Sequence, residues 1–290
     1  MSTRHKASAT PSPEKGSEAR STASVRPGAP RRAARPGVLA SAAAPVTVVA
    51  LVCIWQLVCS LGLVPSFLLP SPVAVVQALV GDWQLLAGHA VTSLAEAALG
   101  LGAGIALGFG AAVVMDRFEL VYRAFYPLVV LTQTIPTVAI APLLVLWFGY
   151  GMLPKVVLIV VSTFFPITVG LLDGFRSVDP DVIDLMRSMG ASRAQIMRHA
   201  KLPASLPHFF SGLKISAAYA IVGAVIAEWL GGFSGLGVYM TRVRSAYAFD
   251  KMFAVILLIS ALSLVLMRVV EVVRRAAMPW ERPERARRDR

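Results

Sequence analysis

The sequence predicts an all-α integral membrane protein, a bundle of six spanning helices whose two termini both lie in the cytoplasm. Composition is the first observation: 56% of the 290 residues are hydrophobic, 15% are charged, and the mean hydropathy is +0.68. Soluble globular domains are less apolar and about 25% charged. The long apolar stretches and the distribution of positive charge are the other two observations.

Six stretches are long and apolar enough to cross a bilayer, which takes about 20 residues. They are residues 38–60, 92–115, 125–148, 154–175, 213–232 and 250–273. Four prolines interrupt the third and fourth stretches: Pro127, Pro136, Pro142 and Pro166. Proline frees backbone groups that neighbouring protein or water must satisfy, so these two helices are expected to face the bundle interior. Ordinary kinks without a functional role are the alternative.

Positive charge tests the six-span count, because Lys and Arg in short flanking loops concentrate on the cytoplasmic side. With both termini inside, the inner segments hold 24 of the 28 Lys and Arg residues. The outer segments hold the other four: Lys155, Arg242, Arg244 and Lys251. The net charge of +12 therefore follows membrane sidedness, and no nucleic-acid partner is expected.

Composition also divides the chain. Residues 1–37 are rich in Ser, Ala, Pro and Arg, which predicts a disordered basic cytoplasmic tail. Residues 38–275 form the predicted transmembrane domain, and residues 276–290 form a second basic cytoplasmic tail. Between the first two spans, residues 73–80 are expected to form a short amphipathic helix on the outer surface.

The second span carries glycines every four residues, at Gly100, Gly104 and Gly108. This smooth face predicts close packing of another helix, and a dimer contact is the alternative. The two cysteines, Cys53 and Cys59, lie on different faces of one helix, and no histidine has a metal-ligand spacing to Cys, Asp or Glu. No disulfide, metal site or catalytic residue is expected.

The segment between the fourth and fifth spans has clear start and stop signals. Asp179 is a candidate N-cap, Pro180 occupies the first helical position, and Gly190 falls where a C′ residue belongs, which predicts a helix over 180–189. Ser192 begins a Ser-x-x-Gln capping box and a second short helix, whose end is expected near Pro203.

Both short helices carry an apolar side and a basic side. Such an element does not bury its apolar side alone. One interpretation is a helix pair in the membrane interface, where basic residues meet anionic lipid. The other is a docking surface for a soluble partner on the cytoplasmic face. The residues themselves leave both interpretations open.

The stretch DLMRSMGASRAQIMRHAKLPASLP, which contains these helices, resembles the EAA loop of permease subunits of binding-protein-dependent ABC importers. That pattern reads Glu-Ala-Ala, three residues, Gly, nine residues, then Ile-x-Leu-Pro. Gly190, Leu202 and Pro203 match it at the right spacing. The chain departs from it at four positions: Asp184, Leu185, Met186 and Ala200.

Two flanking segments extend the resemblance to about residues 45–275. The stretches TQTIPTVAIAPLLVLWFGYG and GLKISAAYAIVGAVIAEWLGGFSGLGVYM are similar to the nitrate/sulfonate/taurine branch of that family. Within the branch they resemble most the permeases for thiamine-precursor pyrimidines, followed by riboflavin permeases. The expected substrate is therefore a pyrimidine such as hydroxymethylpyrimidine, with riboflavin, a sulfonate or taurine, and nitrate as alternatives.

The resemblance implies a type I importer permease in a bacterial inner or plasma membrane. Two permease copies would form the pathway, and an external binding protein would deliver the substrate. The EAA-like loop, residues 176–212, would insert into a cytoplasmic ABC ATPase that uses ATP and Mg²⁺, while this chain binds no cofactor. The resemblance assigns six residues to the ATPase-coupling part of the loop: Asp184, Gly190, Ala191, Ser192, Leu202 and Pro203.

Polar groups inside spans are candidates for the translocation pathway, because they are costly in a bilayer. Gln133 precedes the expected kink at Pro136, where interhelical hydrogen bonding is the alternative role. Glu228 and its neighbour Trp229 lie late in the fifth span, before a Gly-rich turn similar to a gate region. Glu96 lies in the second span, and both carboxylates are expected to be close enough to the surface to be solvated.

Two other classes of function are weaker. A secondary transporter requires an ion site built from intramembrane carboxylates, or inverted repeats, and a membrane enzyme requires converging His, Asp or Glu residues. The sequence shows neither pattern. The segment GYGMLPK at 149–155 lacks the second glycine and the Ser or Thr of a phosphate-binding loop, so ATP hydrolysis is expected in a separate subunit.

Overall fold

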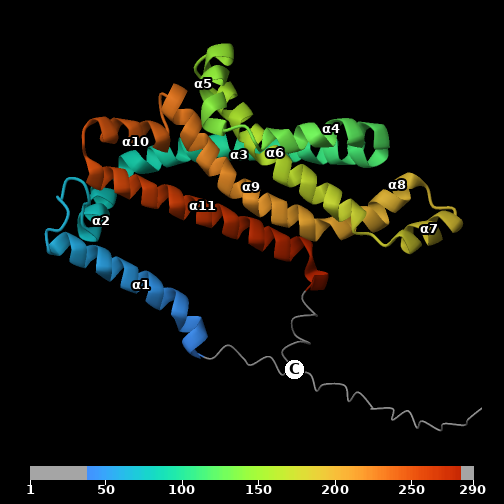
Figure 1. Ribbon diagram of the computed structural model, residues 1–290, viewed down its shortest axis with the longest axis horizontal. Helices are drawn as coiled ribbons and strands as arrows, with labels where there is room; N and C mark the ends of the chain where they lie inside the picture. Colours follow the sequence, from blue (N-terminus) through green and yellow to red (C-terminus); the bar gives the residue numbers. More distant parts are fainter. Residues whose placement is uncertain (1–37, 282–290) are drawn as a thin grey trace, which may run out of the picture. The chain divides into compact units, whose positions relative to one another are not determined.

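The computed structural model describes residues 38–281 and the side chains of residues 45–280. The predicted tail 1–37 and residues 282–290 of the second tail lie outside the described residues. The chain divides into two units, Met1–Val49 and Ala50–Arg290, and the arrangement below is that of the second unit. All regular structure in the described residues is helical, with no strand (Figure 1).

The helices follow one another with short connections. The first half comprises α1 (Val38–Ser60), α2 (Pro72–Gly81), α3 (Trp83–Arg117), α4 (Glu119–Thr132), α5 (Thr137–Phe148) and α6 (Met152–Arg176). The second half comprises α7 (Pro180–Ser188), α8 (Arg193–Ile196), a π-helical turn (Met197–Lys201), α9 (Leu202–Gly231), α10 (Leu236–Ser245), α11 (Phe249–Ala277) and a 3₁₀ turn (Pro279–Glu281).

Within the described residues, four helical stretches are long and apolar enough to cross a membrane: Trp83–Arg117, Met152–Arg176, Arg193–Gly231 and Phe249–Ala277. A fifth is obtained if α4 and α5 together count as one span. The expected first span coincides with α1, of which Pro45–Ser60 falls in the range where side chains are described. The chain is thus a multi-pass membrane protein of the predicted all-α class.

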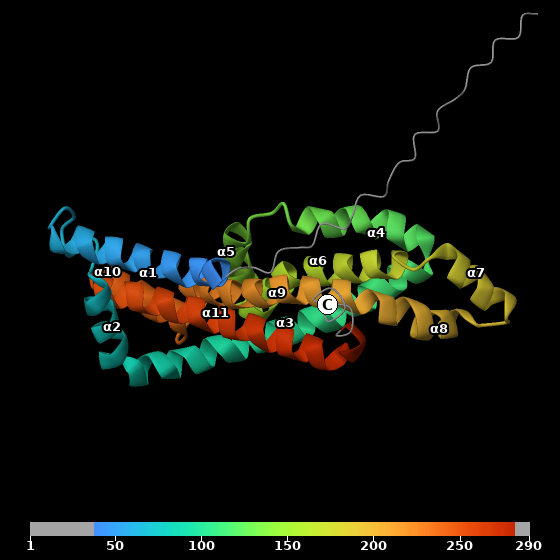
Figure 2. The ribbon, with the colours of Figure 1, turned by 90° about the horizontal axis from the view of Figure 1, so that it is seen from below.

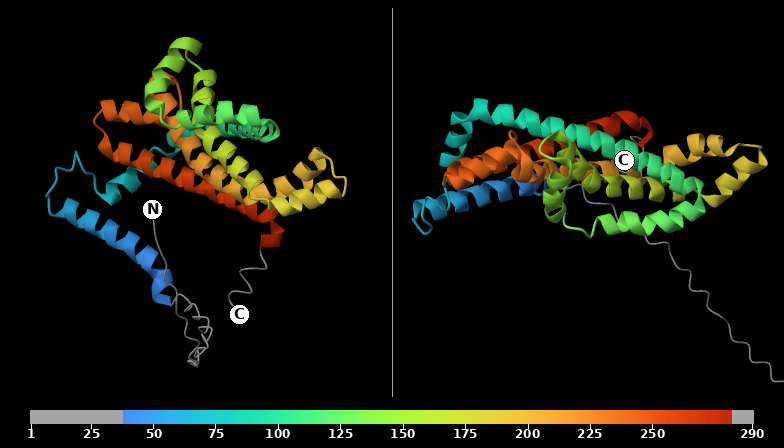
Figure 3. Two further views of the ribbon diagram at one scale, coloured as in Figure 1. Left: turned by 45° about the vertical axis from the view of Figure 1, so that its right-hand side comes forward. Right: turned by 90° about the horizontal axis from the view of Figure 1, so that it is seen from above.

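The expected third span, 125–148, is not one kinked helix. α4 and α5 meet at an angle of 100° (Figures 1 and 3). Pro136 has extended backbone angles, φ −60° and ψ 118°, and a proline also disfavours helical geometry in the residue before it. The last turn of α4 tightens, with Gln133 N–H donating to the Val130 carbonyl at 3.1 Å, and the helix ends there.

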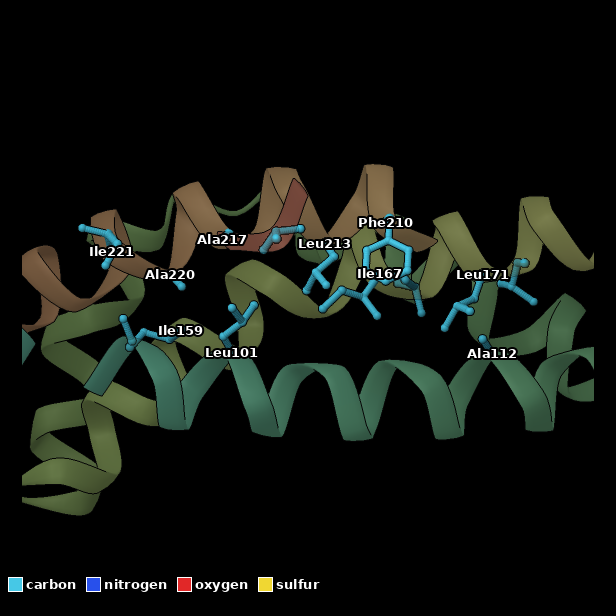
Figure 4. Close-up of a cluster of buried hydrophobic side chains, with 14 of the residues drawn as sticks. Leu101, Ala112, Ile159, Ile167, Leu171, Phe210, Leu213, Ala217, Ala220 and Ile221 are labelled. Atoms are coloured by element: carbon cyan, nitrogen blue, oxygen red, sulfur yellow. The ribbon is translucent and has the colours of Figure 1, made fainter. Parts of the chain in front are cut away.

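The core lies where α3, α6 and α9 pack together. Figure 4 shows apolar side chains of these three helices meeting, among them Leu101 of α3, Ile167 of α6 and Leu213 of α9. The predicted glycine face of α3 is buried against α6, where a Cβ at Gly100 would meet Ile159 and one at Gly104 would meet Thr163. Interior packing of this face is therefore confirmed.

Two sets of short helices lie at opposite ends of the bundle, with α2 and α10 at one end and α7 and α8 at the other (Figures 1 and 2). The short helix expected over 73–80 is α2, which Ser71 caps by accepting from the N–H of Ala74. Asp82 follows α2 and accepts hydrogen bonds from Lys251 at 2.8 Å and Tyr239 at 2.6 Å. Lys251, followed by Tyr239, holds the pKa of Asp82 below its usual value.

Candidate functional site

The helix pair α7–α8 has the local structure that its sequence predicts. Asp179 caps α7 by accepting from the N–H of Asp181 at 2.9 Å. Gly190 has a φ of +81°, and the N–H groups of Gly190 and Ala191 donate to the carbonyls of Arg187 and Met186, each at 2.9 Å. This is the Schellman pattern of a helix that ends at a left-handed residue.

Ser192 forms the predicted capping box at the start of α8. Its hydroxyl accepts from the N–H of Gln195 at 3.3 Å, and the Gln195 side chain accepts from the N–H of Ser192 at 2.7 Å. The turn between the two helices is therefore held by caps on both sides and has a defined geometry.

The expectation that the second helix ends near Pro203 is wrong. Leu202 and Pro203 instead begin α9, and the stretch from Arg193 to Gly231 is one helical run of 39 residues. The chain passes through a π-helical turn, in which the N–H of Leu202 donates to the carbonyl of Met197. Pro203 has no N–H that could donate to the carbonyl of His199, as an α-helix would require. A wider π turn at this point therefore sacrifices no hydrogen bond from Pro203, and the helix continues.

The apolar side of α7 is largely uncovered by the described residues, and its best-covered members, Ile183 and Met186, are only half-buried. None of its residues is buried, and Leu185 and Met189 are 61% and 79% exposed. Asp184 lies on the same helix and accepts a hydrogen bond from Arg187 at 3.0 Å, with both side chains exposed. The helix pair is thus a capped element with an open apolar surface.

An ion pair connects the end of the helix pair to α3. Lys201, the last residue of the π turn, donates to both carboxylate oxygens of Asp116, at 2.6 and 2.8 Å, and both side chains are largely buried. Charged hydrogen bonds of this kind are the stronger ones in proteins. The π turn is therefore attached to α3 as well as to α9.

The candidate pathway residues of the third span lie at the break between α4 and α5. Gln133 and Pro136 both line a pocket of about 280 Å³ that α6 and α9 close on the other side, through residues such as Ser162 and Tyr219. A second pocket of about 420 Å³ lies along the same helices and also contains Gln133 and Tyr219. The structure thus places Gln133 where the two pockets meet.

Glu96 and Glu228 are not solvated, contrary to expectation. Each is 1% exposed, and each is held by buried hydrogen bonds. Lys155 donates to Glu96 Oε1 at 2.5 Å, and Ser93 donates to Glu228 Oε1 at 2.6 Å. A charged side chain is costly in the interior unless it is paired and hydrogen-bonded. Lys155 pairs with Glu96 Oε1, while Glu96 Oε2 is buried without a hydrogen-bond partner among the described residues, and Glu228 is hydrogen-bonded but forms no ion pair with a described residue.

The same group of residues holds the Gly-rich turn before α10. Glu228 Oε2 accepts from the N–H of Gly237 at 2.6 Å, and Ser93 Oγ accepts from the N–H of Leu236 at 2.9 Å. His89 Nδ1 accepts from the N–H of Gly235 at 3.0 Å. We call Ser93, Glu96, Lys155 and Glu228, together with His89, the buried polar network; it fixes the turn rather than leaving it free.

Sequence reasoning missed three members of this network. Lys155 was expected in an outer loop, but it lies in the first turn of α6 and is buried. A charge at the edge of an apolar stretch is the signal that could have identified it. Ser93 and His89 carry no sequence signal for this role. Trp229, beside Glu228, is 44% exposed.

Among the described residues, no group of His, Cys, Asp or Glu side chains has the arrangement of a metal site. The features that the structure does bring together are the helix pair, the two pockets at the α4–α5 break, and the buried polar network. The buried polar network lies in the core, the two pockets lie against α6 and α9, and the helix pair projects beyond the core at one end of the bundle.

Comparison with known proteins gives consistent matches. Residues 100–278 match the family described as "Binding-protein-dependent transport system inner membrane component". The chain is 40% identical to a probable ABC transporter permease protein of Haemophilus influenzae, covering 74% of this chain and 88% of that protein. It is 36% identical to the formylaminopyrimidine transport permease protein ThiX of Halalkalibacterium halodurans, covering 75% and 88%.

Among solved structures, the inward-facing MetNI methionine ABC transporter has a similar fold, with a TM-score of 0.60 and 20% identity. The match covers 68% of this chain and 97% of the other chain.

Proposed function

The chain belongs to the family of binding-protein-dependent transport system inner membrane components, and from this premise we propose that it forms the translocation pathway of an ATP-driven importer for a thiamine-precursor pyrimidine. The family and the relatives named as transport permeases support the role of importer permease.

The observation that carries the coupling role is the open apolar side of α7. A helix with exposed Leu185 and Met189 and a fixed turn at Gly190 suits docking into a groove of another protein. We assign this groove to a cytoplasmic ABC ATPase that hydrolyses Mg-ATP. The α2–α10 end then faces outward, toward a substrate-binding protein, and a second permease copy completes the pathway.

Support for the pyrimidine comes from the relative named for formylaminopyrimidine transport. Riboflavin, a sulfonate or taurine, and nitrate are the alternatives within the same branch. An ion-coupled secondary transporter is the alternative from a different class, and it would work without an ATPase.

Substitution on the apolar side of α7 tests the docking proposal. Leu185→Asp is expected to abolish recovery of an ATPase when the tagged permease is purified in mild detergent, because it places a charge in the docked surface. The control Arg187→Gln changes the opposite side of the same helix, 200° away at 100° per residue, and is expected to retain the ATPase. Mass spectrometry of the purified complex measures both.

Equal ATPase recovery by the two variants would contradict docking through α7. A wild-type permease that purifies without any ATPase and transports under an ion gradient would contradict the importer proposal itself, and would favour the secondary transporter.

The Lys201–Asp116 pair is expected to carry movement of the helix pair into α3. Lys201→Met removes two charge-assisted hydrogen bonds. A hydrogen bond to a charged group contributes about 1.5–3 kcal/mol to stability. We expect ATPase binding to persist while ATP-driven uptake into vesicles falls severalfold. The reversed pair Asp116→Lys with Lys201→Asp should recover part of the uptake, and Arg187→Gln serves as the control. Unchanged uptake in the single variant would show that the pair transmits nothing.

A further inference from the structure

The two pockets at the α4–α5 break form one continuous candidate site. The first is lined by the break itself and the second by α6 and α9, and Gln133 and Tyr219 belong to both. Their volumes, about 280 and 420 Å³, lie just below and near the lower limit of the range for ligand pockets, roughly 300–1,000 Å³. The site therefore suits a small solute.

Gln133 and Tyr219 present free polar groups to this site. The side chains of both are exposed, Tyr219 by 46%, and neither forms a side-chain hydrogen bond with another described residue. Ser162 adds a hydroxyl whose proton is donated to the Leu158 carbonyl at 3.0 Å, so its oxygen can accept. An amide, a phenol ring and a hydroxyl acceptor thus converge from three segments of the chain.

These groups match the chemistry of a nitrogen heterocycle. A glutamine amide pairs in a bidentate manner with an amino group next to a ring nitrogen, as it does with adenine. An aromatic side chain offers a face on which a planar ring stacks. The combination of Gln133 and Tyr219 can therefore orient one edge and one face of an amino-substituted aromatic ring.

The charges at the site disfavour an anion. Neither pocket is lined by a lysine or an arginine. The charged side chain in the lining is Asp173, which forms no ion pair with a described residue, and His208 lies in the same pocket. A sulfonate or nitrate would lose hydration without gaining a cation, and it would face the Asp173 carboxylate.

We propose that Gln133 and Tyr219 form a substrate-contact site that accepts uncharged or weakly basic planar nitrogen heterocycles and excludes anionic solutes. This proposal rests on the proposed importer function and defines its substrate class: it favours a pyrimidine and disfavours sulfonates, taurine and nitrate.

Saturation-transfer difference NMR on the full-length permease in lipid nanodiscs tests the site, because this method detects weak binding. The probes are hydroxymethylpyrimidine, and methanesulfonate as the anion. We expect saturation of the pyrimidine protons by the wild-type protein and at least a fivefold loss of that signal in the Gln133→Leu/Tyr219→Leu variant. Methanesulfonate should show no saturation above empty nanodiscs.

Thr134→Val is the matched control, since Thr134 is next to Gln133 and exposed but lines neither pocket. It should retain the pyrimidine signal. The substituted side chains are all exposed, so the variants are expected to fold, and size-exclusion chromatography verifies this. A gain-of-function variant completes the test: Gln133→Arg supplies the missing cation and should bring methanesulfonate saturation above background.

Each result decides the proposal. A pyrimidine signal that survives the double variant, that is absent from the wild type, or that methanesulfonate equals in the wild type would overturn it. The importer proposal is judged separately by ATPase recovery, so a failed binding site with a recovered ATPase would remove the substrate class and leave the importer function in place.

Discussion

Lys155→Met is expected to destabilise the protein strongly, because it leaves the Glu96 carboxylate buried without its cation. Lys155 and Glu96 are both buried, and their side chains are in direct contact at 2.5 Å. Removing one partner of a buried ion pair typically costs about 3–5 kcal/mol. For a chain of this size, the unfolding temperature falls by about 2–4 °C per kcal/mol, so the expected decrease is on the order of 10 °C.

Thermal unfolding of the purified permease, followed by tryptophan fluorescence, measures this effect. The control is Arg123→Met, which breaks an ion pair with Glu119 that is exposed on both sides and is worth about 1 kcal/mol or less. The double variant Lys155→Met/Glu96→Met replaces the pair by apolar side chains and should recover most of the stability. If Lys155→Met unfolds at the same temperature as Arg123→Met, the buried pair does not form.

The local structure of the helix pair was predictable because it depends on neighbouring residues. Asp179, Gly190 and Ser192 act through hydrogen bonds that reach no more than five positions along the chain. The local sequence therefore specifies these caps completely. The glycine face of α3 was predictable for a related reason, since its four-residue spacing is a property of one helix.

The buried polar network was not predictable because its partners meet only in the folded chain. Lys155 is 59 positions from Glu96, and Ser93 is 135 positions from Glu228. From hydropathy alone, Glu96 and Glu228 are expected to be in water, because they lie near the ends of spans and an ionised carboxylate is stable there. The fold supplies buried donors instead, and this outcome depends on how α3, α6 and α9 pack.

The effects expected of Pro203 and Pro136 were wrong because packing between helices, and not proline alone, decides how the chain continues. Pro203 was expected to end a helix, yet a π turn absorbs the missing hydrogen bond and α9 continues. Pro136 was expected to kink a span, yet it separates two helices at 100°. The rule says where the hydrogen-bond ladder is interrupted, while packing against the neighbouring helices decides whether the chain continues or turns.

The turn at Gly190 offers the sharpest test of coupling. Gly190 has a φ of +81°, and a Cβ placed there would meet no atom within 4 Å. Within the described residues, any effect of a substitution therefore comes from the backbone conformation and not from a clash. A left-handed residue with a side chain costs about 1–2 kcal/mol, and a β-branched side chain is the least tolerated.

Gly190→Val is accordingly expected to reduce ATP-driven uptake by about tenfold or more, since each 1.4 kcal/mol changes an equilibrium tenfold. The variant should insert into the membrane, and its unfolding temperature should fall by no more than about 2–8 °C, because the only cost is the backbone conformation of an exposed turn that is remote from the α3, α6 and α9 core. Gly190→Asn is the matched control, as asparagine tolerates the left-handed region and should retain most of the uptake. Uptake in inside-out and right-side-out vesicles, with ATPase recovery measured in parallel, distinguishes lost coupling from lost binding. Equal uptake by the valine and asparagine variants would show that the fixed bend between α7 and α8 is not needed for the proposed coupling to an ATPase.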